Sequence, residues 1–252
     1  MIQKSFDVDG PPDIEVRIES GRVEVRRSES GIVDVSVDTG SPDFIVEQRG
    51  NSILVSSDQT RSWSSRGSAF VAIQTPEGSD LRVSVASADI RVDVALGKVE
   101  LKSASGDMEI GNAETLEVKS ASGDLRVDRV TRSLRFSSAS GDLLVTGAVA
   151  GNVEISTASG DTNINDADAT VEINTASGDT RLHRFTGRSA NFKAMSGTVD
   201  IGIPRRTEVS LDANLLSGRL RLPDPEPTQG EAERQTSIRA KLVSGDLTIE
   251  RV

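Results

Sequence analysis

The chain has 252 residues, of which 35% are hydrophobic and 27% are charged, and its formal net charge is −10. It has no cysteine, which excludes disulfides, thiolate catalysis and zinc sites built on cysteine. The acidic balance argues against electrostatic binding to nucleic acid or to an anionic membrane surface. No apolar run is long enough to insert into a bilayer, and residues 1–16 lack the apolar stretch of a signal peptide. We therefore expect a cytoplasmic protein that does not insert into a membrane itself.

Residues 6–55 alternate between apolar and polar side chains, as in Ile14-Glu15-Val16-Arg17-Ile18. This period of two predicts half-buried strands. Their spacing is irregular, so we interpret residues 1–70 as a capping region of β-strands that continues into the repeats described next. Residues 56–68 are polar and contain Trp63. Trp63 either packs back on the body of the protein or contacts a partner, since tryptophan is enriched at binding hot spots.

A Ser-Gly-Asp tripeptide recurs down the rest of the chain. Counting from the degenerate copy at Ser87, the serines are separated by steps of 18, 17, 18, 19, 18, 19, 21 and 27 residues, which can be read from the sequence. Variant copies begin at Ser196 and Ser217. The complete copies, which we predict to be structural corners, are Ser105-Gly106-Asp107, Ser122-Gly123-Asp124, Ser140-Gly141-Asp142, Ser159-Gly160-Asp161, Ser177-Gly178-Asp179 and Ser244-Gly245-Asp246.

Each corner lies between two alternating segments, such as Leu116-Glu117-Val118-Lys119 before Ser122 and Leu125-Arg126-Val127-Asp128 after Asp124. A unit of about 18 residues with two short strands cannot bury its own apolar face, whereas stacked units can. The sequence therefore predicts an all-β fold, a β-solenoid of single-stranded β-helix type with irregular capping strands at its ends. A series of antiparallel hairpins is the alternative. Only the solenoid places equivalent residues of successive rungs about 4.8 Å apart.

The corner residues have physical roles in this prediction. The glycines are expected to have positive φ or to face a neighbour too close for a Cβ atom. The serines can satisfy corner backbone groups, and the alanine before most of them suggests a tight space. Stacked aspartates would repel each other by roughly 1 kcal/mol per adjacent pair in water. Backbone donors, solvent, flanking basic side chains or a bound cation must offset this repulsion. We favour solvated turn carboxylates over a cation site and predict no metal.

Residues 223–237 have no apolar periodicity and are predicted to be a polar loop within a repeat domain spanning 71–252. After this loop the last rung resumes at Ile238 and ends with Val243-Ser244-Gly245-Asp246-Leu247.

Several segments together resemble the DUF4097 family of β-strand-repeat proteins, also called toastrack or putative-adhesin domains. They are Val71–Gly78, Leu81-Arg82-Val83, the Ser-Gly-Asp repeats and the closing Val243–Leu247. The resemblance is good over residues 70–252. The resemblance implies a β-solenoid-like fold without established catalytic residues. It also implies a connection with cell-envelope stress sensing and with membrane-anchored partners. This chain differs in having no membrane segment of its own.

Catalytic motifs are sparse. His183 is the only histidine and is flanked by arginines in a strand-like segment, so we expect it at the surface. No Gly-x-Ser-x-Gly nucleophile motif and no phosphate-binding loop occurs. A carbohydrate-active β-helix enzyme is less favoured, because the chain has only one tryptophan and six phenylalanines with which to stack sugars. We predict a non-enzymatic scaffold without cofactor that binds an unidentified protein, for instance a membrane-anchored envelope-stress protein, through a long regular β face. A self-assembling homo-oligomer or filament is the alternative.

Overall fold

The structure is a computed structural model that describes residues 1–29, 31–39, 44–57, 68–223 and 234–252. The described residues form strands and no helix, which confirms the predicted all-β class. Among them there is accordingly no helix that could span a membrane. The chain divides into two compact units, Met1–Val127 (unit 1) and Asp128–Val252 (unit 2).

The described part of unit 1 is built from short and long strands in chain order. They are β1 (Ile2–Asp7), β2 (Asp13–Arg27), β3 (Ile32–Thr39), β4 (Phe44–Arg49), β5 (Ser52–Ser57), β6 (Ala69–Thr75), β7 (Asp80–Val92), β8 (Leu96–Ser105), β9 (Met108–Ser122) and the start of β10 (Leu125–Ser140).

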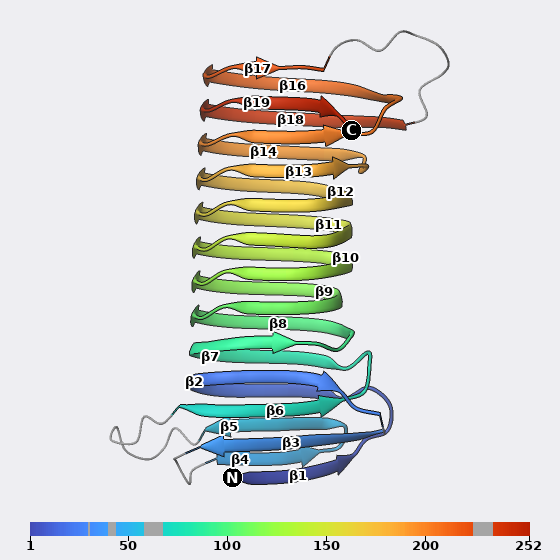
Figure 1. Cartoon of the computed structure of the whole chain (residues 1–252), viewed down its shortest axis with the longest axis vertical. Helices are drawn as coiled ribbons and strands as arrows, with labels where there is room; N and C mark the ends of the chain where they lie inside the picture. Colours follow the sequence, from blue (N-terminus) through green and yellow to red (C-terminus); the bar gives the residue numbers. More distant parts are fainter. Residues whose placement is uncertain (30, 40–43, 58–67, 224–233) are drawn as a thin grey trace. The chain divides into compact units, whose positions relative to one another are not determined.

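The repeats of unit 1 stack in parallel and in register. Strand β7 pairs with β8 so that Leu81 lies opposite Val99 and Ser87 lies opposite Ser105. Its second half pairs with β9, where Ile90 lies opposite Met108. The register advances by the 18 residues of the sequence repeat, so each turn of chain lies on the previous one (Figure 1). This arrangement confirms the solenoid for these rungs and excludes hairpins between them.

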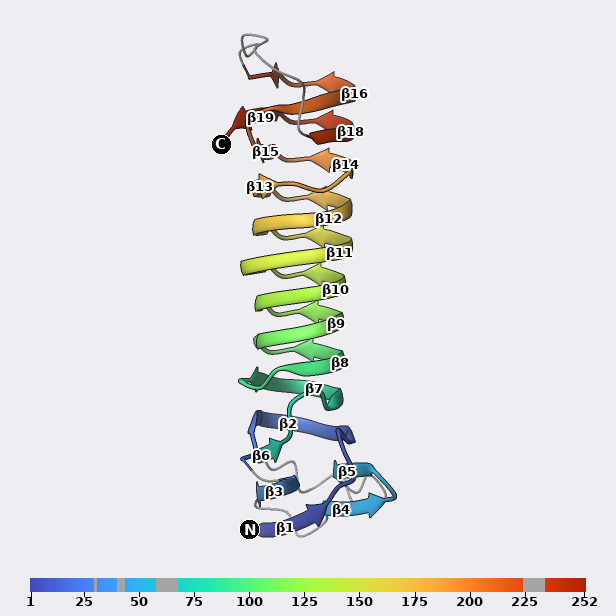
Figure 2. The same cartoon turned by 90° about the vertical axis from the view of Figure 1, so that its right-hand side faces the viewer.

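Strand β2 is a complete rung inside the segment predicted to be an irregular cap. It runs parallel to β7 with Ser20 opposite Ser87, so the series of corners starts at Ser20 and not at Ser87. On its other side β2 pairs in parallel with β5 and β6. Antiparallel strands then end the stack, with β3 on β6, β4 on β5 and β1 on β3 (Figure 2).

Unit 2 continues the same pattern of strands and corners. Its further strands are β11 (Leu143–Ser159), β12 (Thr162–Ser177), β13 (Thr180–Phe185), β14 (Ser189–Ser196), β15 (Val199–Ile203), β16 (Thr207–Ser217), β17 (Leu220–Arg221), β18 (Arg234–Ser244) and β19 (Leu247–Arg251). Because β18 begins at Arg234, residues 234–237 of the predicted polar loop belong to a strand, and residues 224–233 lie outside the described part.

The rungs of unit 2 are also parallel. Val153 of β11 lies opposite Val171 of β12, and Ser159 lies opposite Ser177. Strand β12 then pairs with β13 and β14, and β13 pairs with β15, with Ser177 opposite Ser196.

The last rungs are not stacked in chain order. Strands β18 and β19 pair with β14 and β15 on one side and with β16 and β17 on the other. The closing repeat around Ser244 therefore lies inside the stack, and the earlier rung β16–β17 is outermost (Figure 2). The expectation that the chain's last repeat is also the last rung is wrong.

The core of each unit lies between the arms of the rungs. Along β12 the inward side chains Ile164, Val171 and Ile173 are buried, while the residues directly beside them, such as Asn165 and Thr170, are exposed or half-buried, as the alternation predicts. Larger side chains, such as Phe136 and Phe192, fill the core of unit 2. Burying one such side chain stabilises the fold by roughly 1.5–3 kcal/mol.

Candidate interaction surface

The corner glycines are held by the stack itself. Gly178 has a φ of 134°, and a Cβ atom built on it would lie 2.1 Å from the carbonyl oxygen of Gly160 in the rung below. Both predicted reasons for glycine, a positive φ and a close neighbour, therefore hold at once. The same conformation recurs at Gly106, Gly123, Gly141, Gly160, Gly197, Gly218 and Gly245.

A hydroxyl two residues before the corner serine closes each of several corners. Ser103 Oγ donates to the carbonyl oxygen of Ser105 at 2.8 Å, and Thr175 Oγ1 donates to that of Ser177 at 3.0 Å. This position is not among the corner residues predicted from the sequence. The available signal was the Ser or Thr that recurs two residues before the five consecutive corners from Ser105 to Ser177.

The corner aspartates form a ladder of backbone hydrogen bonds. In unit 2 the N–H of Asp161 donates to Asp142 Oδ1 at 2.7 Å, and the N–H of Asp179 donates to Asp161 Oδ1 at 2.8 Å. Asp107 and Asp124 continue the same pattern in unit 1. The carboxylates of Asp89, Asp107, Asp142 and Asp161 thus each accept a hydrogen bond from the next rung, which offsets the predicted repulsion between like charges. No group of three acidic or histidine side chains placed to hold a metal occurs among the described residues.

The remaining candidates for chemistry are dispersed. His183 is exposed on β13, on the outer face of its strand, as expected. Trp63 lies outside the described residues, so its role stays a prediction.

Ion pairs link the outward side chains of neighbouring rungs. Arg82 Nε lies 3.2 Å from Glu100 Oε2 in unit 1, and Arg135 Nη2 lies 2.5 Å from Glu154 Oε2 in unit 2. The pKa of Glu100 lies below its ordinary value, chiefly because Lys98 donates a hydrogen bond to it and also because Arg82 does so. Much of the charge on the outer faces is therefore paired with opposite charge within the chain.

One column of outward side chains changes character along unit 2. The alanines before the corner serines, such as Ala158 and Ala176, are exposed, so the tight space predicted for them is wrong. In the next rungs this position holds Met195, Val243 and Leu216, which are 63%, 49% and 78% exposed. The registers of the flanking residues place these three in that order from β14 through β18 to β16. We call Met195, Val243 and Leu216 the corner ridge.

A shallow groove of about 670 Å³ runs beside two members of the corner ridge. Its lining includes Ala158, Ala176, Met195 and Val243. Lys193 and Lys241 line the same groove and lie opposite each other in the register of β14 and β18. Lys193 Nζ also lies 3.1 Å from Glu172 Oε1. The groove is thus an apolar strip with basic side chains.

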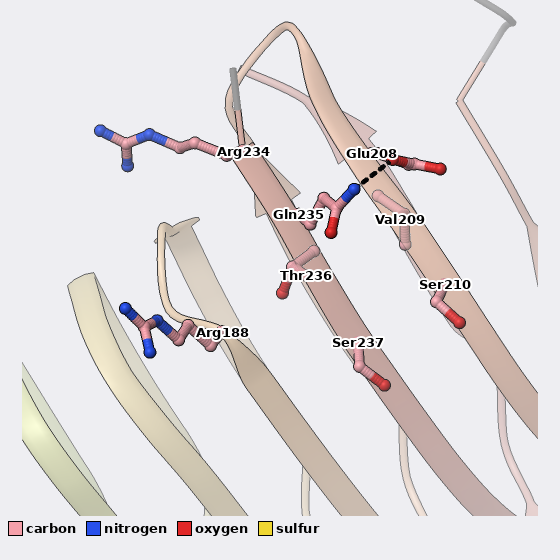
Figure 3. Close-up of a pocket in the computed structure, with 8 residues that line it drawn as sticks. All are labelled: Arg188, Glu208, Val209, Ser210, Arg234, Gln235, Thr236 and Ser237. Atoms are coloured by element: carbon pink, nitrogen blue, oxygen red, sulfur yellow. Dashed lines mark hydrogen bonds between the residues drawn. The ribbon is translucent and has the colours of Figure 1, made fainter. Parts of the chain in front are cut away.

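A second groove, of about 920 Å³, lies beside the opposite end of strands β16 and β18. Figure 3 shows Arg188 and Arg234 extending to one side, away from Glu208, whose carboxylate accepts a hydrogen bond of 2.9 Å from Gln235. Thr236 donates to the backbone of Gly187. The polar groups of this groove therefore do not converge on one point.

The outermost rung of unit 2 leaves apolar side chains half-exposed. Leu211 and Leu215 of β16 face inward but are only partly covered, whereas Ile238 and Leu242, their register partners in β18, are buried. Among the described residues, β16 pairs only with β18. Leu220 and Leu222 beyond the corner are exposed as well.

The model of the Toastrack family DUF4097 matches residues 12–250, nearly the whole chain. The chain belongs to the Toastrack family. This membership agrees with the resemblance found in the sequence and extends it to β2, whose rung the spacing of the repeats did not reveal. No curated protein matches this Toastrack chain.

Solved structures resemble the Toastrack chain over its full length. A "putative lipid binding protein" from Parabacteroides distasonis has a TM-score of 0.53 and 13% identity, and the match covers 100% of this chain and 96% of that one. A "putative adhesin" from the same species has a TM-score of 0.52, 13% identity and the same coverage. Another, from Parabacteroides merdae, has a TM-score of 0.51, 12% identity and coverage of 100% and 95%. Identities this low show the shared fold alone.

Proposed function

We propose that this Toastrack protein is a non-enzymatic interaction scaffold whose partner protein contacts the corner ridge and its groove. The proposal narrows the long β face predicted from the sequence to one edge of unit 2. The single observation that carries it is the exposed run Met195–Val243–Leu216, which stands where the earlier repeats have alanine. Clustered exposed apolar side chains with a polar rim are typical of protein-binding sites.

The charges of the groove favour a partner of a particular chemistry. Lys241 is exposed, and Lys193 pairs with the carboxylate of Glu172. A partner surface with an apolar centre and acidic flanks would complement both the ridge and these lysines. Adhesion, envelope-stress sensing and attachment to a membrane-anchored protein are roles that such a scaffold could serve, in the cytoplasm or at a membrane surface.

The test is site-specific photo-crosslinking of the full chain in its native cells. A photoreactive phenylalanine replaces Met195 or Val243, and the matched control replaces Thr170, an exposed residue of β12 away from the Ser-Gly-Asp corners. We expect one discrete protein adduct from the two ridge positions and none from the control. Equal adducts from all three positions, no adduct, or adducts with lipid alone would contradict the proposal.

A further inference from the structure

We infer that the outermost rung of unit 2 pairs with the same rung of a second copy, through antiparallel contact between the two β16 strands. This inference uses the backbone edge of β16, whereas the proposed partner site is tested at Met195 on β14 and Val243 on β18; only Leu216 of the corner ridge lies on β16. It starts from the strand edge that β16 presents and from the half-exposed side chains Val209, Leu211, Ala213 and Leu215.

Unit 1 of the same chain shows what completes a rung of this kind. There β6, which runs parallel to β2, is covered by the antiparallel strand β3, with Val37 opposite Val71 and Val35 opposite Ile73. All four of these side chains are buried. An antiparallel strand that alternates apolar and polar residues can therefore bury the inward side chains of an end rung. Strand β16 has this alternation.

The charges on β16 and the overlap of its inward residues together favour one register for the pair. In an antiparallel pair centred on Leu211, the inward residues 207, 209, 211, 213 and 215 of one copy all lie opposite members of the same series. The outward residues Glu208 and Asp212 then lie opposite Asn214 and Ser210. Centring the pair on Ser210 would set Glu208 against Asp212, and centring it on Asp212 would set that carboxylate against itself. Like charges directly opposite each other destabilise a sheet, which disfavours the registers on Ser210 and Asp212. The register on Leu211 also pairs the whole inward series 207–215 with itself, which centring on Val209 or Ala213 does not, so it is favoured.

The outer strands of unit 1 have features that disfavour edge-to-edge pairing with a second copy. Strand β1 is short and carries Lys4, whose Nζ donates to the carbonyl oxygen of Val46 at 2.7 Å. Short edge strands with lysine resist edge-to-edge association. An open filament needs two different surfaces that complement each other, whereas a twofold dimer needs one surface that complements itself. The rung β16–β17 therefore predicts a closed dimer rather than a filament.

The absence of cysteine allows a direct test of the register in the full-length protein. Antiparallel neighbours have Cα atoms about 4.5–5.5 Å apart, which lies within the range that a disulfide can bridge. We expect the single variant Leu211→Cys to form a disulfide-linked dimer under mild oxidation. The control Thr170→Cys, also in unit 2, should stay monomeric at the same concentration, and circular dichroism should show both variants folded.

A pair of charge variants tests the same register without crosslinking. Ser210 is exposed, so its replacement leaves the rung intact. In the dimer Ser210→Lys faces Asp212 of the other copy twice, and Ser210→Asp faces it with a like charge. In sedimentation velocity over a range of concentrations, we expect a dissociation constant roughly fivefold lower for Ser210→Lys and roughly fivefold higher for Ser210→Asp.

Three results would overturn the inference. They are a strict monomer at all concentrations, oligomers whose size keeps growing with concentration, and equal crosslinking of Leu211→Cys and Thr170→Cys. Failure of the dimer leaves the proposed function standing, because the photo-crosslinks at Met195 and Val243 report a different surface. A dimer without any adduct at those two positions would reject the proposed function alone.

Discussion

At the scale of single residues, the Ser-Gly-Asp corner combines three separate constraints. The glycine lies against the carbonyl of the rung below, the aspartate accepts a hydrogen bond from the rung above, and a hydroxyl two residues earlier satisfies the corner carbonyl. Each constraint acts between rungs or within one corner and needs no ligand. The repeat is therefore explained by folding.

The glycine constraint predicts a large difference between two positions with positive φ. Gly178→Ala should lower the free energy of unfolding by on the order of 3 kcal/mol, because the new Cβ meets the Gly160 carbonyl as well as an unfavourable φ. Gly50, with a φ of 62°, has open space where a Cβ atom would lie, with no neighbouring atom within 4 Å. Gly50→Ala should cost only about 1 kcal/mol. Urea unfolding of both variants measures the difference, and equal losses would contradict it.

The aspartate ladder predicts a contrast between two replacements of Asp161. Asp161→Ala removes the acceptor for the N–H of Asp179 and should cost about 1 kcal/mol. Asp161→Asn keeps an oxygen acceptor and removes a like charge, so its stability should equal or exceed that of the parent. Thermal unfolding with and without calcium completes the test. A melting temperature that rises with calcium would indicate a cation site instead.

The Glu100 ion pairs predict a small dependence of stability on pH. The pKa of Glu100 in the folded chain lies below its ordinary value, chiefly through the hydrogen bond from Lys98. The ionised Glu100 therefore contributes its full stabilisation above the pKa that this residue has in the unfolded chain. That stabilisation is lost as the pH falls through the pKa of Glu100 in the folded chain. The stability difference between the parent and Glu100→Gln should shrink below about pH 4.5, from a value under about 1 kcal/mol. A difference that stays constant from about pH 7 to about pH 3 would contradict this assignment.

At the scale of strands, the alternation and the spacing of the serines were enough to predict parallel rungs. Ser159 lies opposite Ser177 because the residues between them complete one turn of the chain. The order of the last rungs could not be predicted in this way. Steps of 21 and 27 residues fit either stacking order. The inward residues do not distinguish the two orders either, because Leu211, Ala213 and Leu215 of β16 lie opposite Ile238, Ala240 and Leu242 of β18, which are of similar size.

The candidate surface was less predictable than the fold. The alanine column was visible in the sequence, but the direction of its side chains depends on how the chain turns at each corner. Only with that direction known do Met195 and Val243 stand out as exposed. The same holds for β2, whose corner at Ser20 lies 67 residues before Ser87 and so falls outside any regular spacing.

The inner and outer rungs of unit 2 should differ in their tolerance of core truncation. Phe192 of β14 is 1% exposed, and Phe192→Ala should cost about 3–5 kcal/mol through the lost burial and the cavity left behind. Leu211→Ala on the half-exposed rung should cost about 1 kcal/mol in the monomer. Denaturant unfolding at low protein concentration compares the two. A larger loss for Leu211→Ala would mean that its rung is covered within the chain.

At the scale of the whole molecule, two association surfaces with different chemistry follow from one repeat. The corner ridge arises where alanines give way to larger apolar side chains, and the β16 edge arises where the stack of unit 2 ends. Both depend on the same physical claim, that equivalent residues of successive rungs lie directly opposite each other. A net charge of −10 opposes non-specific association of copies, so pairing requires a matched edge.

The most direct test of that claim uses pairs of cysteines in the otherwise cysteine-free chain. Ser159 lies opposite Ser177, and Ser177 lies opposite Ser196. Stacked rungs place the first two about 4.8 Å apart and the outer two about 9.6 Å apart. Ser159→Cys with Ser177→Cys should form an intramolecular disulfide under mild oxidation, whereas Ser159→Cys with Ser196→Cys should not, because Cα atoms beyond about 7 Å cannot be bridged. Equal crosslinking of both pairs, or of neither, would contradict the stacked solenoid.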